Sequence, residues 1–179
     1  MPWPATVGQI VHGRMISPYS AHSIGAVIGA IGAVASTVWP AAQLALYVPF
    51  RTAQAIRIAG FFWMNGATVN GNTDCGVYDS GGAKLTSSGA TAQAGASAIQ
   101  SVALGTAIII PAGVFYLALL STSATATYFT GPSLTAEEAR HIGITDQASA
   151  GTSLPATMTR STPGTGGVPL FGIYSGNAP

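Results

Sequence analysis

A chain of 179 residues has room for one domain with a single core of modest size. Only 6% of its residues are charged and the formal net charge is +1, whereas soluble proteins usually carry about 25% charged residues. Six basic residues spread over the whole length argue against the phosphate-neutralising patch that nucleic-acid binding requires, so we expect no nucleic-acid partner. A chain this neutral favours association, which indicates a protein that hides much of its surface in contacts.

Residues 1–41 are rich in Gly, Pro, Ala and Ser, and we expect them to form an N-terminal arm that needs a neighbour to pack against. The apolar run 23–50 raises the question of a membrane span. Pro40 and Pro49 interrupt it, however, and its uninterrupted part, 24–35, is shorter than the roughly twenty residues that cross a bilayer as a helix. We therefore expect no membrane partner, and a small protein anchored by this run is the third alternative.

From residue 42 the apolar residues recur with a period of two, which is typical of strands with one face on a core. Ser80-Gly81-Gly82 indicates a tight hairpin, because adjacent glycines supply the positive φ values that such turns require. The predicted strands are 44–50, 55–64, 73–79, 83–88, 97–104, 114–120 and 124–130. The predicted core residues are Leu46, Val48, Ile56, Ile58, Val77, Leu85, Val102, Phe115, Leu117 and Leu119.

About seven short strands separated by turn signals predict an all-β protein, an antiparallel β-sandwich with a jelly-roll-like arrangement over residues 42–130. Residues 131–179 are expected to form an extended C-terminal arm. Within it, Ser133 or Thr135 can cap a short helix that has Glu137 and Glu138 near its start, where the helix dipole favours them. The apolar run 168–174 predicts a segment that docks on another surface.

The residues that could carry metal or catalytic chemistry are few and separated. His12, His22 and His141 lack a second ligand-type residue at metal spacing, so we expect no metal site. Asp74 and Asp79 are five residues apart, which on a strand places their side chains on opposite faces rather than across one cleft.

Other residues support the same interpretation. Asp79 is better placed to accept hydrogen bonds from the hairpin turn, and the single cysteine, Cys75, is expected to be a small buried hydrophobe. No serine lies in a Gly-x-Ser-x-Gly elbow. We expect no catalytic residue and no cofactor, and interpret the chain as a non-enzyme.

Aromatic side chains leave one binding alternative open. Trp63 and Tyr78 could stack on sugar rings if they are exposed, although Trp63 follows Phe61 and Phe62 and fits a core or an interface at least as well.

The central half of the chain resembles β-sandwich proteins encoded among the structural genes of tailed bacteriophages. The stretches that carry the resemblance are 44–51, 65–79, 87–95 and 115–119. It is a likeness of scaffold without a site motif, and both arms lie outside it. The resemblance implies a virion component, either a capsid decoration protein or a part of a tail or fibre.

Our leading hypothesis is a capsid decoration, or cement, protein on the capsid surface, homo-oligomeric and bound to the major capsid protein through its arms. The alternative is a tail, baseplate or fibre protein whose sandwich binds a host surface glycan through Trp63 and Tyr78. The expected assembly contacts are the apolar residues of the arms, namely Trp3, Ile10, Ile24, Ile28, Leu170 and Phe171.

Overall fold

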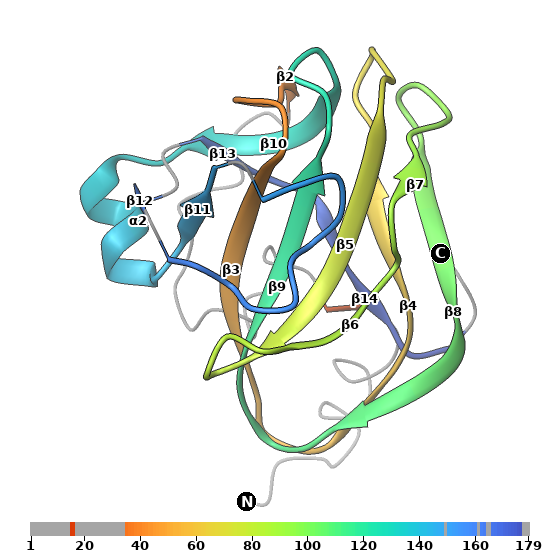
Figure 1. Cartoon of the computed structure of the whole chain (residues 1–179), viewed down its shortest axis with the longest axis vertical. Helices are drawn as coiled ribbons and strands as arrows, with labels where there is room; N and C mark the ends of the chain where they lie inside the picture. The colour runs from red at the N-terminus through yellow and green to blue at the C-terminus, as the bar shows by residue number, and fades with distance from the viewer. Residues whose placement is uncertain (1–14, 17–34, 149, 161, 164–165, 177–179) are drawn as a thin grey trace, which may run out of the picture.

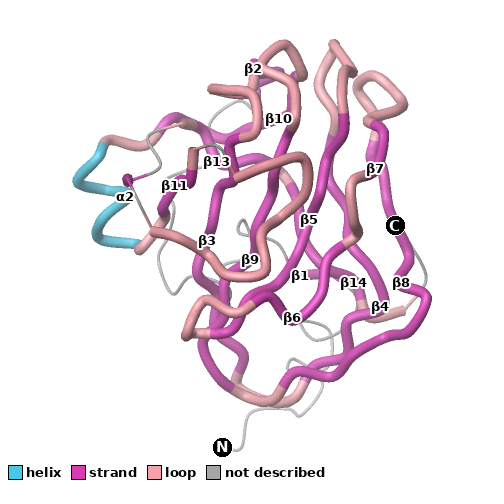
Figure 2. Tube along the Cα trace, in the orientation of Figure 1, coloured by secondary structure: helices cyan, strands magenta, loops and turns pink. Residues whose placement is uncertain are grey.

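The computed structural model describes residues 15–16, 35–148, 150–160, 162–163 and 166–176, and the statements below refer to these residues. Every strand pairing among them is antiparallel, and the strands stack in two main layers (Figures 1 and 2). The predicted all-β sandwich is confirmed.

The first layer is built around three long neighbouring strands, β3 (Leu44–Thr52), β9 (Gly113–Ser121) and β5 (Asn72–Asp79). Short strands complete it on both sides. The order is β12-β11-β3-β9-β5-β6, and β7 also pairs with β5. The short strands are β6 (Lys84–Ser87), β7 (Thr91–Ala92), β11 (Thr145–Gln147) and β12 (Thr162–Pro163).

The second layer has the order β1-β14-β4-β8. Its strands are β1 (Met15–Ile16), β14 (Phe171–Tyr174), β4 (Ile56–Met64) and β8 (Ile99–Ile110). A small third sheet, β13-β10-β2, is formed by β13 (Gly167–Pro169), β10 (Thr127–Ser133) and β2 (Ala35–Val38). One helix of the described part, α2 (Ala136–Ile142), follows β10 at the side of the sandwich (Figure 1).

Strand alternation places one face of each long strand in the main core between the two layers. Seven of the ten predicted core residues are buried there: Leu46, Val48, Ile58, Val77, Phe115, Leu117 and Leu119. Ile56 and Val102 are partly buried against the same core. Leu85 was predicted wrongly, since it is 40% exposed on the edge strand β6.

A second, smaller core covers the outer face of the first layer. It contains Ala45, Tyr47, Tyr78, Ala118 and Leu120 of the sheet together with Leu154 and Met158. The last two belong to the covering loop, which we define as residues 150–160. The outer face of this layer is therefore sealed from water by the chain's own C-terminal part.

Residues 131–179 differ from the expected extended arm. They supply α2 and four strands, and β14 lies inside the second layer between β1 and β4, where its residues are all buried. The physical reason is that the apolar run 168–174 pairs with β4 of its own chain, Phe171 opposite Trp63. Of the predicted N-terminal arm, residues 1–14 and 17–34 lie outside the described residues, while β1 and β2 pair within the sheets.

Local predictions around the turns are confirmed. Thr135 caps α2 with a reciprocal capping box to Glu138, and Glu137 pairs with Arg140 along the helix. Asp79 accepts a hydrogen bond from the Ala83 amide at 2.8 Å in the β5–β6 turn. β8 runs six residues further than the predicted end at residue 104, because its pairing with β4 shifts register between Gly60 and Ile58 and then resumes.

Candidate functional site

The two predicted sugar-stacking residues do not reach the surface. Trp63 lies in the main core and Tyr78 in the second core, and both are fully buried. Neither ring can stack on a glycan in this structure, so this assignment is wrong. The sequence could not show it, because three consecutive aromatic residues at 61–63 carry no polar alternation that marks the exposed face.

Tyr78 instead holds the covering loop in place. Its hydroxyl donates to the Pro155 carbonyl oxygen at 2.6 Å, and its ring packs edge-on against Tyr47, with centroids 5.3 Å apart. Burial raises the pKa of Tyr78 well above its usual value and that of Tyr47 to about 12. Both phenols therefore stay protonated and act as structural hydrogen-bond donors.

Of the six predicted assembly residues, the structure describes only Leu170 and Phe171. Trp3, Ile10, Ile24 and Ile28 lie outside the described residues. Phe171 is fully buried in the main core, so it is not available as an assembly contact. Leu170 is half-buried, and its backbone bonds to β10 through Phe129 and to β4 through Met64.

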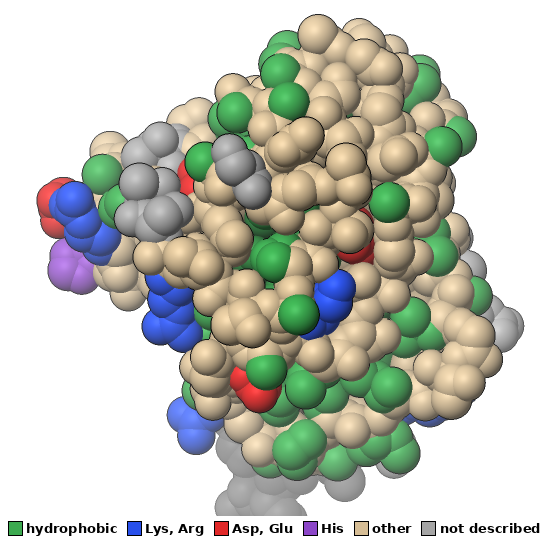
Figure 3. Space-filling view, in the orientation of Figure 1, with side chains coloured by type: hydrophobic (Ala, Val, Ile, Leu, Met, Phe, Trp, Pro, Cys, Tyr) green, Lys and Arg blue, Asp and Glu red, His purple; other side chains and the backbone are tan. Residues whose placement is uncertain are grey.

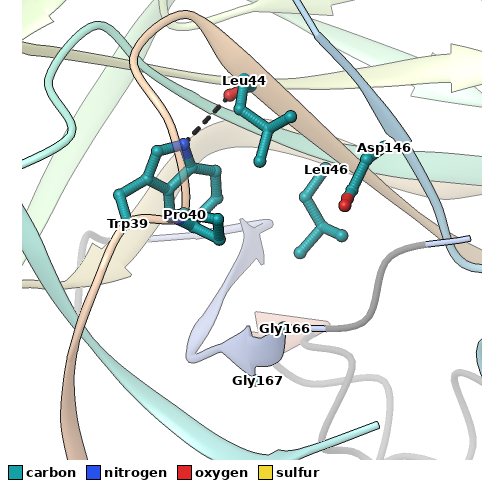
Figure 4. Close-up of a pocket in the computed structure, with 7 residues that line it drawn as sticks. All are labelled: Trp39, Pro40, Leu44, Leu46, Asp146, Gly166 and Gly167. Carbon is teal, nitrogen blue, oxygen red and sulfur yellow. Dashed lines mark hydrogen bonds between the residues drawn. The ribbon is translucent and has the colours of Figure 1, made fainter. Parts of the chain in front are cut away.

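One small pocket contains an acidic group and is drawn in Figure 4. Trp39 forms one wall, donating from Nε1 to the Leu44 carbonyl oxygen at 3.2 Å and packing edge-on against Tyr128. Asp146 enters from β11, where it pairs with Leu46 of β3. Pro40 and the glycines 166 and 167 complete the lining.

This pocket is chemically distinct but small. Its volume of about 20 Å³ is room for about one water molecule, too little for an organic substrate. Burial raises the pKa of the Asp146 carboxyl to about 6, because ionisation beside apolar walls is disfavoured. The arrangement can bind or release a proton near pH 6. This property could not be predicted from the sequence, since the burial of Asp146 depends on Trp39 and Leu46, about a hundred positions away in the chain.

Asp74, which sequence reasoning weighed as a catalytic carboxylate, has a structural role. It is fully buried and accepts a hydrogen bond from the Leu154 amide at 2.8 Å, and from the hydroxyls of Ser87 and Ser88. The neighbouring Cys75 is buried as predicted, and burial together with the Asp74 charge raises the pKa of its thiol. Asp74 therefore ties the covering loop and β6 to β5, and Cys75 packs in the main core.

Within the described residues, no group of three or more His, Cys, Asp and Glu side chains lies close enough to hold a metal ion. His141 is exposed on α2. No helix among the described residues has the length and apolarity to span a bilayer.

On the face shown in Figure 3, charged side chains are few and apolar side chains are scattered among the other atoms. In this view, apolar side chains gather at the lower end, over the ends of β3, β8 and β9. Five large aliphatic side chains are exposed, from 40% for Leu85 to 73% for Ile109; the others are Val38, Ile99 and Val114.

Comparison with known proteins gave no match to a family model, to a curated protein or to a solved structure.

Proposed function

We propose that this protein is a structural component of a virion, a capsid decoration protein that binds coat subunits and thereby stabilises the shell. The observation that carries the proposal is the nature of the surface: almost uncharged, yet with large aliphatic side chains exposed. An isolated soluble protein usually carries far more charge, whereas a subunit in an assembly covers such a surface with its neighbours.

The proposed mechanism is mechanical. Each contact with a coat subunit would bury apolar area worth about 25 cal/mol per Å². Repeating a weak contact around a closed lattice multiplies its effect, because neighbouring contacts raise each other's effective concentration. The resemblance of the stretches 44–51, 65–79, 87–95 and 115–119 to sandwich proteins of tailed phages supports a virion component, in the capsid or in the tail.

The test is the position of the protein in particles purified from a culture that produces it, determined by cryo-electron microscopy. We expect density over the capsid lattice, in contact with coat subunits. Density confined to the tail would replace the capsid role with one in tail assembly or adsorption. Particles that lack the protein would overturn the proposal.

A second test addresses the N-terminal residues that were expected to act as an arm. A variant lacking residues 1–34 loses only β1 among the described strands, a two-residue strand at a sheet edge. We expect it to remain folded by circular dichroism and to fail to bind shells in co-sedimentation. Normal occupancy of the shell by this variant would contradict arm-mediated binding.

A further inference from the structure

Among the sheet edges that the structure describes, β8 is the only long one left open. The other edge strands are two to four residues long. β12 and β13 each end in proline, which cannot donate to a partner strand. β6 is covered, because Lys84 donates its amide to Ala156 of the covering loop and Ala83 bridges to Thr157. Proteins generally shield their edges in these ways, since an open edge can pair with another chain.

β8 has none of these protections along its first half. Its sequence from Ile99 to Ile110 contains no proline and no charged residue. On one side it pairs with β4, and no described strand pairs with its other side (Figure 1). The register shift bends β8 only after Ala103, so residues 99–103 form a regular, open edge.

The side chains of this edge divide cleanly between the two faces. Gln100 and Val102 lie opposite Trp63 and Phe61, whose side chains are in the main core. Ile99, Ser101 and Ala103 therefore lie on the outer face, where Ile99 is 48% exposed and Ala103 is also exposed. Along the outer face of this edge, a large apolar side chain (Ile99) is followed by a small polar one (Ser101) and a small apolar one (Ala103).

We propose that two copies of this chain pair antiparallel through residues 99–103 of β8, around a two-fold axis at Ser101. In this register Ile99 of each copy lies opposite Ala103 of the other, a large side chain against a small one, and the two serines face each other. The two second layers then join into one continuous sheet across the axis.

The uncharged edge favours a second copy over a foreign strand. Complementary charge is one means by which a protein selects a partner of different sequence, and residues 99–103 offer none. The same neutrality removes the repulsion that identical charged strands would feel across a two-fold axis. Closed two-fold pairing is also the commonest symmetry of soluble oligomers.

This inference deepens the proposed assembly role and rests on it, but it is tested on purified protein, whereas the assembly role is tested on particles. Pairing of five residues is small for an interface, so we expect a weak dimer that forms as concentration rises. Sedimentation velocity over a wide concentration range measures it. A full-length protein that stays monomeric throughout would overturn the proposal.

Cross-linking tests the register directly. Paired Cα atoms of antiparallel strands are about 4.5–5.5 Å apart, within the range that a disulfide bridges. A Ser101→Cys variant should therefore form a covalent dimer on mild oxidation, while the native thiol, Cys75, is buried. Ser153→Cys, at an exposed serine of the covering loop, is the matched control. Equal dimer yields from the two variants, or none from Ser101→Cys, would overturn the pairing.

Charge at the axis gives an independent readout. Ser101→Lys should raise the dimer dissociation constant by about tenfold or more, since two like charges would meet at the axis. A mixture of Ser101→Lys with Ser101→Asp should restore pairing, because opposite charges would then meet. Both variants should keep the wild-type circular dichroism spectrum, as Ser101 lies on the outer face. Failure of the mixture to pair, with both variants folded, would contradict the two-fold axis.

Discussion

Asp146 shows how the fold changes the chemistry of one residue. Its carboxyl lies beside Trp39 and Leu46 in a pocket that admits about one water molecule, and burial raises its pKa from 3.8 to about 6. The folded protein therefore holds this proton more tightly than the unfolded chain does. Ionisation of Asp146 then opposes folding, and its contribution to stability is lost as pH rises through about 6.

We expect the wild-type melting temperature to fall between pH 4 and pH 7 by an amount that Asp146→Asn abolishes. The variant should melt higher than the wild type at pH 7 and close to it at pH 4, because the amide imitates the protonated acid. Thermal unfolding followed by circular dichroism across this pH range measures it. Glu137→Gln, at an exposed carboxyl on α2, is the control for removing a carboxyl group outside the pocket. Equal slopes in all three proteins would show that Asp146 is not the titrating group.

Gly60 is a position where the close approach of two strands requires the absence of a side chain. A Cβ atom there would collide with the Tyr174 hydroxyl and with the Val102 carbonyl oxygen of β8. We expect Gly60→Ala to lower the free energy of unfolding by about 1–3 kcal/mol, measured by urea denaturation. Gly105→Ala is the matched control, since a Cβ in that glycine meets open space. Equal stability of the two variants would contradict the crowding at Gly60.

At the scale of elements, the covering loop joins the C-terminal part of the chain to the first layer. Asp74 accepts the Leu154 amide, Tyr78 donates to Pro155, and the Lys84 ammonium donates to the Leu154 carbonyl at 2.6 Å. The Arg160 guanidinium lies 4.6 Å from the Tyr116 ring centroid at the loop's far end. A segment without regular structure is thus fixed by polar contacts around two apolar anchors, Leu154 and Met158.

Leu154→Ala should destabilise the protein by about 2–5 kcal/mol, because the truncated side chain leaves a cavity over Tyr47 and Tyr78. Leu85→Ala, at an exposed leucine of β6, should change stability by less than about 0.5 kcal/mol. Chemical denaturation of both variants tests this expectation. A small effect at Leu154 would mean that the loop does not seal the second core in solution.

Strands were predictable where burial follows local alternation. In β3 and β5 the period of two marks the face that lies in the main core, whereas β9 is a continuous apolar run because both of its faces are buried. The covering loop has no such period, since Leu154 and Met158 are single buried anchors separated by Pro155, Ala156 and Thr157. The apolar run 168–174 was correctly predicted to dock on another surface. Local sequence could not show that this surface is β4 of the same chain.

The errors in the site predictions have the same cause, because burial by a distant part of the chain cannot be seen in the local sequence. Phe171 looked like a contact for a neighbour because its partner, Trp63, is more than a hundred residues away in sequence. Asp146 looked unremarkable for the same reason. Cys75 was predicted correctly, since a free cysteine in an alternating strand is usually buried whatever its partner strands are.

At the scale of the whole molecule, the two cores share one sheet. β3, β9 and β5 bury one face in the main core and the other in the second core, so loss of either core exposes the same strands. We therefore expect a single cooperative unfolding transition rather than separate melting of the covering loop and the sandwich.

The buried Cys75 thiol reports this transition. It is fully buried at β5, and burial raises its pKa, so a thiol reagent should react with it only when the molecule opens globally. The labelling rate should follow the stability measured by denaturation and should rise in Leu154→Ala. Fast labelling of the native wild type would show that β5 opens locally.

The central position of β14 affects how the chain folds during synthesis. β14 is the last described strand to be made, yet it lies between β1 and β4 in the second layer. Until the ribosome has released Tyr174, Phe61 and Trp63 lack the strand that covers one edge of β4. The sandwich therefore closes only after residue 174 has been translated, and until then the aromatic-rich strand β4 of the nascent protein is exposed to aggregation.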